Sequence, residues 1–586
     1  MGRFAVWAPR ATRVEVQTRG RQRALHRRDG GWHALDDPQA EAGDDYCFIL
    51  DGGRPLPDPR SAWQPHGVHG SSRLVDHGSF AWSDAGWRGR ALHDMVVYEL
   101  HCGTFSDAGT FDGAIERIGH LVDLGVGAVE LMPVAEFPGS HGWGYDGVAL
   151  YAAHHPYGGP VALKRFVDAC HSAGLAVIMD VVYNHLGPDG NVLGEFGPYF
   201  TDRYRTPWGD AINYDGVGSD EVRSFVVDNA LMWLRDYHVD GLRLDAVHAI
   251  VDTSAVHILE DIAGAVHGLA EAMGRELWVI AESDLNDPRL VIDPRLGGFG
   301  CDAQWSDDFH HALHATLAED TAGYYADFGA VADVAAALQQ VFVNPGGYSP
   351  FRGRRHGRGV GDVPSTRFLG YMQNHDQVGN RAQGERSSAL MSTGRLLIAA
   401  ALVLLGPFVP MLFMGEEWAA STPFLYFTDH EDADLGRAVS DGRRHEFASF
   451  GWNPDDVPDP QDAASFRRSR LDWTETGDEP RATVLRWHRE LIALRAANPA
   501  LRDGDRSAMV VEHDEDARTL VMRREGVSVA CNWGEAAVCV SVAGGEAAHL
   551  LSDGAQACAA GVQLEPNSVA VLVTPDVVRA RAAPTP

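Results

Sequence analysis

The sequence has 586 residues, of which 45% are hydrophobic and 22% are charged, a composition typical of a globular protein rather than a disordered or fibrous one. A chain of this length exceeds what one hydrophobic core usually fills, so we expect a large central domain with smaller domains attached. The 49 basic and 81 acidic residues give a net charge of −32, which disfavours nucleic acid and anionic membranes as partners. A neutral substrate suits this charge, although an acidic surface can also serve solubility alone.

The cysteines and the first residues indicate the compartment. The seven cysteines are scattered and show no CxxC pair or zinc-type spacing, which predicts reduced structural thiols. The opening segment MGRFAVWAPR has no charged head followed by an apolar stretch, so no secretory signal is expected. We therefore expect a cytoplasmic protein.

Residues 1–90 predict an N-terminal, immunoglobulin-like β-sandwich. Short alternating segments such as FAVWAPRATRVEV and GDDYCFIL are separated by Gly, Asp and Pro, which is the pattern of antiparallel strands.

Residues 91–500 predict an α/β fold, a (β/α)8 TIM barrel. Short apolar runs alternate with segments of helical periodicity, such as GAIERIGHLVDLG and LKRFVDACHSAG, which requires parallel strands joined by crossover helices. The eight expected strands are Val96–Leu100, Ala128–Val134, Ala176–Val182, Gly241–Val247, Leu277–Ser283, Cys301–Trp305, Phe368–Gln373 and Val409–Gly415.

Two stretches of this domain depart from the simple repeat. Residues 184–220 are rich in Gly, Pro, Tyr and Asp and are too long for an ordinary βα loop, so we expect them to form one wall of a cleft. The apolar run Leu396–Gly415 is long enough to cross a bilayer, but Gly406, Pro407 and Pro410 interrupt it. It predicts a buried helix, a turn and a buried strand.

Residues 501–586 return to short alternating strands, among them TLVMRR, VSVACNW and SVAVLVT. They predict a C-terminal antiparallel β-sandwich.

Acidic residues follow the predicted barrel strands. In a (β/α)8 barrel, catalytic groups lie at the C-terminal ends of the strands. The four carboxylates there are Asp180, Asp245, Glu282 and Asp376. A single such aspartate is more often a helix cap, but four carboxylates directed at one face repel one another, which indicates chemistry or a metal.

Two of these carboxyl groups suit glycoside hydrolysis, which requires an ionised carboxylate and a protonated acid. Asp245 and Glu282 follow adjacent strands and could approach the roughly 5 Å separation of a retaining mechanism. Arg243 shares a strand face with Asp245 and is expected to orient it, which makes Asp245 the nucleophile. Glu282 follows the apolar run LWVIA, and partial burial would raise its pKa, so it is the expected proton donor.

Four segments resemble the conserved regions of the α-amylase superfamily: DVVYNH, GLRLDAVH, IAES and QNHD, in that order. The resemblance implies that Asp376 stabilises the transition state, that His185 and His375 bond the same glucose, and that Tyr145 stacks beneath its ring. A structural role for the two histidines is the alternative. The superfamily contains hydrolases, transferases and isomerases, so the reaction needs further residues.

Longer segments narrow the resemblance. YELHCGTFSDAGTF, LMPVAEFPGSHGWGYDGV, RLDAVHAI and FMGEEW with PFLYFTDH are similar to the maltooligosyltrehalose trehalohydrolase family. That family cleaves the α-1,4 bond next to the terminal trehalose of maltooligosyltrehalose, after a synthase has formed that unit. His248 and Ala249 stand where many starch-cleaving relatives carry Lys and His, which agrees with this family and makes His248 a candidate substrate-binding residue.

The segment after the eighth strand offers further contacts. Asp429 and His430 could bond hydroxyls on the trehalose side of the cleft, and Phe424 and Phe427 could offer flat faces to sugars. The alternative for the two phenylalanines is packing against the barrel.

Other enzymes and a non-enzymatic role remain as alternatives. A glycogen branching enzyme shares the domain order, and a catalytically silent glycan-binding protein would be expected to lack some of the carboxylates. We expect no cofactor and no metal in the chemistry, since two carboxylates and water suffice. Superfamily members often bind calcium near the third strand, where Asn184 and Asp189 are possible ligands.

Overall fold

Eight parallel strands close into a barrel in the computed structural model, which describes residues 3–449, 453–541, 547–558 and 561–574. In order around the barrel the strands are β10 (Ala128–Leu131), β13 (Ala176–Val181), β16 (Gly241–Leu244), β17 (Trp278–Ala281), β18 (Ala303–Trp305), β21 (Phe368–Gly370), β22 (Val409–Phe413) and β9 (Val97–Leu100). Each lies inside one of the eight predicted segments, so the predicted (β/α)8 barrel is confirmed. Buried Val, Ile and Leu favour such strands, which are covered on both faces.

Helices cover the outside of the barrel. The principal ones are α3 (Ile118–Leu124), α4 (Gly159–Ser172), α6 (Ser219–Asp236), α7 (Ile258–Met273), α8 (Asp307–Ala318), α9 (Val331–Gln340), α12 (Thr393–Leu405) and α15 (Arg481–Ala497). The connection from β17 to β18 departs from this pattern, because it holds only two 3-10 turns, Pro288–Leu290 and Pro294–Leu296. Each turn begins at a proline, which fixes the backbone angle and cannot donate a backbone hydrogen bond.

The apolar run at residues 396–415 forms a buried helix, a turn and a barrel strand, as predicted. Helix α12 ends at Leu405 and β22 begins at Val409, and Gly406 and Pro407 lie in the turn between them. All residues from Leu397 to Leu405 are buried. Among the described residues, no helix is long and apolar enough to cross a membrane.

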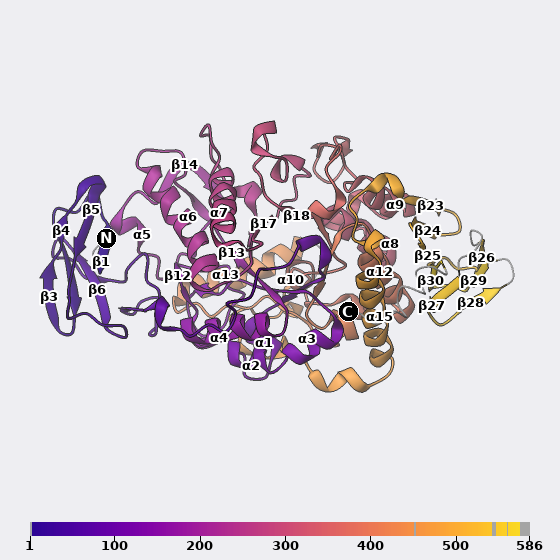
Figure 1. Cartoon of the computed structure of the whole chain (residues 1–586), viewed down its shortest axis with the longest axis horizontal. Helices are drawn as coiled ribbons and strands as arrows, with labels where there is room; N and C mark the ends of the chain where they lie inside the picture. Colours follow the sequence, from indigo (N-terminus) through magenta and orange to yellow (C-terminus); the bar gives the residue numbers. More distant parts are fainter. Residues whose placement is uncertain (1–2, 450–452, 542–546, 559–560, 575–586) are drawn as a thin grey trace.

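Two sheets lie at the N-terminal end, at the left of Figure 1. One is β1 (Phe4–Trp7), β5 (Trp32–Leu35) and β4 (His26–Arg27); the other is β3 (Arg21–Ala24), β2 (Val14–Thr18), β6 (Asp45–Leu50), β7 (Pro55–Leu56) and β8 (Ser72–Arg73). Their aromatic core reaches the barrel domain, because Trp7 meets Tyr199 edge to face with the ring centroids 5.4 Å apart. The predicted N-terminal β-sandwich is therefore present.

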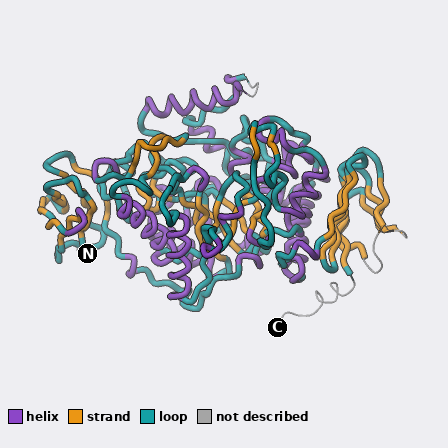
Figure 2. Tube along the Cα trace, turned by 90° about the horizontal axis from the view of Figure 1, so that it is seen from above, coloured by secondary structure: helices purple, strands orange, loops and turns teal. Residues whose placement is uncertain are grey.

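Two further sheets lie at the opposite end of the molecule, as Figure 2 also shows. One is β23 (Val510–Asp514), β24 (Thr519–Arg524), β25 (Val527–Asn532), β30 (Ser568–Val573) and β27 (Ala547–Leu551); the other is β26 (Val538–Ser541), β29 (Gly561–Leu564) and β28 (Ala555–Cys558). Arg524 ties them to the barrel domain by donating to the carbonyls of Leu405, Gly406 and Leu501. The boundaries at residues 90 and 500 remain predictions.

The excursion after β13 forms a short helix and a hairpin. It contains α5 (Leu193–Phe196), β14 (Phe200–Thr206) and β15 (Gly209–Ile212), and α6 follows it. Trp208 occupies the turn of the hairpin and is 48% exposed, which is unusual for a large apolar ring.

Candidate active site

Arg243 is the centre of the candidate site. Its side chain, on β16, is fully buried, and its guanidinium contacts three carboxylates: Asp180 Oδ2 at 2.6 Å, Asp245 Oδ1 at 2.9 Å and Glu282 Oε2 at 3.1 Å. The Trp305 ring lies beneath the guanidinium carbon at 4.2 Å. A planar cation with several fixed donors can hold more than one carboxylate in a defined geometry, which a lysine cannot.

Asp245 directly follows β16 and is held on two sides. Its Oδ1 accepts from Arg243, while its Oδ2 accepts from Asn184 Nδ2 at 2.7 Å. Asn184 also donates to the Asp245 backbone carbonyl at 2.8 Å. The next residue, Ala246, has a φ of 40°, a left-handed conformation that costs about 1–2 kcal/mol for a residue with a Cβ. Strain of this kind often marks a functional site.

Glu282 follows β17 and shares both Arg243 and the strained turn with Asp245. Its Oε2 accepts from the Ala246 backbone N–H at 2.5 Å. Burial raises the pKa of Glu282 well above its usual range, and the neighbouring carboxylates of Asp245 and Asp376 add to this rise while Arg243 opposes it. The shift favours the protonated form of Glu282, which a general acid requires.

Tyr145, Asp180 and His375 form a hydrogen-bonded cluster beside these carboxylates. The Tyr145 hydroxyl lies 2.6 Å from Asp180 Oδ2 and 2.7 Å from His375 Nε2, and its ring stacks on the imidazole with centroids 5.1 Å apart. Burial raises the pKa of Asp180 to about 6, although Arg243 opposes the shift. The cluster joins one phenol, one imidazole and one carboxylate in a single hydrogen-bonded network.

His375 is held from below by Glu99, on β9. The Glu99 carboxylate accepts from the His375 backbone N–H at 3.0 Å and lies 2.5 Å from Nδ1. Burial alone would lower the pKa of His375, but the charges of Glu99 and Asp376 raise it to about 9. His375 is therefore an imidazolium at neutral pH.

Asp376 is the most open of the candidate catalytic carboxylates. It lies in the short helix α10 (His375–Gly379), and its side chain is 37% exposed. Its Oδ1 accepts from Asn380 Nδ2 at 3.2 Å and lies 3.6 Å from His375 Nε2. Its Oδ2 is free of any hydrogen bond to the described residues, so the side chain can bind hydroxyl groups.

His185 connects the site to the excursion after β13. Its Nδ1 lies 2.5 Å from Asn184 Oδ1 and its Nε2 lies 3.0 Å from the Tyr145 carbonyl. The exposed ring of Trp208 stacks on it with centroids 4.4 Å apart and an angle of 6°. Trp208 therefore brings an apolar face to the edge of the site.

His248 lies at another edge, in a 3-10 turn after β16 (Val247–Ala249). Its side chain is 30% exposed, and its Nε2 is 3.9 Å from Asp284 Oδ1. Asp284 in turn pairs with Arg352 at 3.0 Å. These three polar side chains form a second set of hydrogen-bonding groups, and Asp284 lies two residues after Glu282 in the chain.

Asp429 and His430 pack on the loop that carries Tyr145. Asp429 Oδ2 accepts from the backbone N–H and hydroxyl of Ser140 at 2.7 and 2.9 Å, and His430 Nε2 lies 3.8 Å from Asp146 Oδ2. No hydrogen bond among the described residues joins either side chain to Asp245, Glu282 or Asp376. Their predicted contact with substrate remains untested.

Phe424 and Phe427 are core residues. Both side chains are fully buried, and Phe424 stacks on Trp143 with centroids 5.3 Å apart. The packing alternative is therefore confirmed for both rings, and neither presents a face to a sugar.

Sequence reasoning missed two contributors to the site. Glu99 was overlooked because only the residues after each strand were considered, and its strand, VVYEL, ends in leucine. A carboxylate among buried apolar residues is unusual, and this could have indicated a functional role. Trp208 was overlooked because it lies in a hairpin turn, and its exposure is visible only in the structure.

Comparison with known proteins identifies the family. The model of the alpha-amylase catalytic domain matches residues 78–204. A malto-oligosyltrehalose trehalohydrolase from Arthrobacter ramosus is 54% identical over 88% of this chain and 89% of its own. One from Mycobacterium tuberculosis (strain CDC 1551 / Oshkosh) is 50% identical over 93% of this chain and 94% of its own.

The chain belongs to the malto-oligosyltrehalose trehalohydrolase family. It is a glycoside hydrolase of the α-amylase type. Among solved structures, a Salmonella typhimurium protein provisionally assigned as an alpha amylase is 38% identical, covers 97% of both chains and superposes with a TM-score of 0.89.

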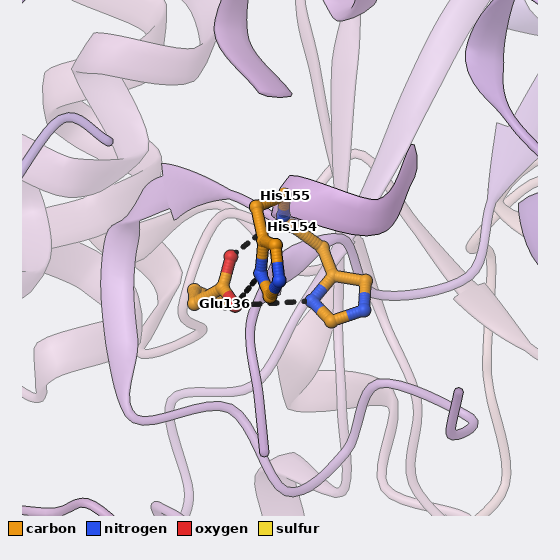
Figure 3. Close-up of side chains that lie close together, drawn as sticks. All are labelled: Glu136, His154 and His155. Carbon is orange, nitrogen blue, oxygen red and sulfur yellow. Dashed lines mark hydrogen bonds and ion pairs between the residues drawn. The ribbon is translucent and has the colours of Figure 1, made fainter. Parts of the chain in front are cut away.

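The residues near the third strand do not fit the calcium site common in the superfamily. Asn184 donates to Asp245 and faces His185, and Asp189 accepts from the backbone N–H groups of Glu431 and Asp432 and lies 3.0 Å from His69. Calcium needs six to eight oxygen ligands, and these two side chains are engaged with protein groups instead. A separate trio of donors, Glu136, His154 and His155, is close enough to hold a metal ion (Figure 3).

Proposed function

We propose that this chain hydrolyses the α-1,4-glucosidic bond adjacent to the terminal trehalose of maltooligosyltrehalose, releasing trehalose and a maltooligosaccharide. The observation that carries the proposal is its 54% identity to a malto-oligosyltrehalose trehalohydrolase over nearly nine-tenths of both chains. The cluster of carboxylates around Arg243 supports the same chemistry, since glycoside hydrolysis requires two carboxyl groups in different protonation states.

Asp245 is the proposed nucleophile of a retaining double displacement. Arg243 and Asn184 donate to its two oxygens and fix the carboxylate beside Glu282. Both acidic groups contact the same guanidinium, which agrees with the roughly 5 Å separation of retaining enzymes. Attack at the anomeric carbon forms a covalent glycosyl-enzyme and breaks the bond to the leaving sugar.

Glu282 is the proposed general acid and base. Its raised pKa keeps a proton available for the leaving oxygen in the first step. Trehalose leaves with that proton, and the carboxylate can then take a proton from the water that attacks the glycosyl-enzyme in the second step, which releases the maltooligosaccharide and restores the enzyme.

The proposed role of Asp376 is to stabilise the transition state, and the surrounding side chains bind the sugar at the cleaved bond. Its exposed carboxylate can accept hydrogen bonds from sugar hydroxyl groups. The positively charged His375 lies beside it and can donate to the same sugar. Tyr145 offers a ring face, and His185 a ring edge. His248, Asp429 and His430 are proposed to contact sugars farther from that bond.

Product analysis tests the proposal. Purified protein is incubated with maltotriosyltrehalose and, separately, with maltopentaose, and the products are separated by chromatography. We expect trehalose and maltotriose from the first substrate and much slower cleavage of the second. Equal cleavage of both would contradict the trehalose specificity, and longer branched products would favour a branching enzyme.

Variants test the assigned residues. Asp245→Ala and Glu282→Gln are each expected to lower kcat by at least about 1,000-fold, because each removes a group that takes part in bond cleavage. Asp293→Asn, at an exposed 3-10 turn, is the matched control and should retain full activity. Near-normal activity in either cleft variant would refute its assigned role.

We further propose that the enzyme acts in the cytoplasm, downstream of a synthase that forms the terminal trehalose. The substrate of the proposed reaction must be made by such an enzyme. In lysates of a strain that lacks the synthase, this enzyme should release no trehalose. Adding maltotriosyltrehalose to the same lysate should restore trehalose release.

A further inference from the structure

Three metal-ligating side chains converge away from the carboxylates of the active site. Glu136 ends β11 (Ala135–Glu136), and His154 and His155 directly follow β12 (Ala149–Ala153), which pairs with β11. Figure 3 shows both imidazoles beside the Glu136 carboxylate, with dashed lines from the carboxylate to each histidine. Of the residues the structure describes, only this trio of His, Cys, Asp or Glu places its ligand atoms within 4.8 Å of one another.

The distances suit a small divalent cation. Glu136 Oε1 lies 3.4 Å from His154 Nδ1 and 2.6 Å from His155 Nδ1. Two ligand atoms that each lie about 2.0–2.2 Å from a tetrahedral Zn²⁺ are about 3.4 Å from each other. The distance between Glu136 Oε1 and His154 Nδ1 already has this value. A shift of the His155 ring by less than about 1 Å would bring the second pair to that spacing.

His154 Nδ1 has only a long 3.4 Å contact with Glu136 Oε1. The His154 side chain is fully buried, and neither ring nitrogen has a hydrogen bond among the described residues. The Phe137 ring stacks on it at 3.6 Å and holds its plane, so that Nδ1 faces Glu136. A buried polar group without a partner costs about 1–3 kcal/mol, and a metal ion at Nδ1 would remove that cost there.

We propose that Glu136, His154 and His155 form a structural site for a zinc-type divalent cation. Two imidazoles and one carboxylate are a ligand set that Zn²⁺ prefers, whereas Ca²⁺ and Mg²⁺ prefer oxygen alone. His155 is 30% exposed and gives the ion a route from solvent, and water completes the fourth position. The other two side chains are sealed in the interior.

The ion would fasten the base of the loop that carries Tyr145. β11 and β12 are the two stems of that loop, and residues 137–148 lie between them. Metal binding would therefore cross-link both stems and limit the motion of Tyr145 relative to Asp180 and His375. The site acts on stability and loop order, and it takes no part in bond cleavage.

Metal analysis of the whole protein tests the site. Protein treated with a chelator is exposed to Zn²⁺, passed through a gel-filtration column and analysed for metal content, and its melting temperature is measured with and without Zn²⁺. We expect one Zn²⁺ per chain and a higher Tm with the ion. Co²⁺ should give the visible absorption of a tetrahedral site.

Two variants and two controls decide the assignment. Glu136→Gln and His155→Ala should each lose the bound ion and the rise in Tm, and the second removes a partly exposed side chain, so folding should survive. His93→Ala and Glu512→Gln, at side chains 53% and 62% exposed, should bind as the wild type does. The proposal is overturned if wild-type protein retains less than about one tenth of an ion, or if both site variants retain it in full.

Discussion

Replacing Glu99 with Gln should move the alkaline limit of activity toward neutral pH. The Glu99 carboxylate accepts a hydrogen bond from the Nδ1–H of His375, and the Tyr145 hydroxyl faces Nε2. A phenol hydroxyl has one hydrogen to donate, and the Tyr145 hydroxyl donates it to Asp180, which is paired with Arg243. Nε2 must then also carry a proton, so the hydrogen bonds assign His375 as an imidazolium.

The size of the effect follows from the pKa of His375. The titratable groups around its ring are Glu99, Asp376, Asp180 and Arg243, and Glu130 lies beyond Glu99. With them its pKa is about 9, which is about 2.5 units, or roughly 3 kcal/mol, above the ordinary histidine value of about 6.5. Loss of the Glu99 charge removes most of this rise. If the pKa returned to the ordinary value of about 6.5, the imidazolium fraction at pH 8 would fall from roughly 90% to about 3%, a decrease of about 30-fold.

The sign of the change is fixed by the charge that is lost. The imidazolium is present below the pKa of His375 and disappears as the pH rises through it, so the wild type should lose activity near pH 9 and Glu99→Gln near or below about pH 7. The assay is kcat/KM against pH for both proteins. In the variant Asp376, 3.6 Å from Nε2, still raises the pKa of His375, whereas burial and Arg243 lower it.

Glu130→Gln is the matched control. Glu130 lies beside Glu99 in the barrel register, and burial raises its pKa well above the usual range, which favours the neutral form that glutamine resembles. This variant should keep the wild-type alkaline limit. A wild-type pH profile in Glu99→Gln would refute the assignment of Glu99 as the residue that keeps His375 charged, whereas a purely structural role would lower activity equally at every pH.

Three further changes test other parts of the structure. Arg243→Lys should lower kcat by about 100-fold, because one ammonium group cannot orient Asp180, Asp245 and Glu282 together, and unchanged single-turnover rates would contradict this. Trp208→Ala should raise KM by about 10-fold with little change in Tm, since its ring is half exposed and lies on His185; an unchanged KM would show that the hairpin does not meet the substrate. Phe424→Ala should lower the free energy of unfolding by about 3–5 kcal/mol in urea titrations, because it empties a buried ring site beside Trp143, and a loss below about 1 kcal/mol would contradict that packing.

The barrel could be predicted from the sequence because its signals are local. Each strand is a short apolar run, and the run at residues 396–415 even showed where its helix ends, since Gly406 and Pro407 interrupt it. The polar residue after such a run must lie at the mouth of the barrel, which is why Asp245 and Glu282 could be selected. The missing helix between β17 and β18 was less evident, because two prolines impose turns there.

The sequence alone determined the order of the strands, the two flanking sheet regions and the acidic groups at the mouth of the barrel, because periodicity and turn residues act over short distances. Only the tertiary structure decided which distant groups meet. Closure of the barrel brings Glu99 against His375, 276 residues later, and the hairpin places Trp208 on His185. Pairing of β11 with β12 likewise assembles Glu136, His154 and His155. Such contacts depend on strand register and loop packing, which no local pattern of residues specifies.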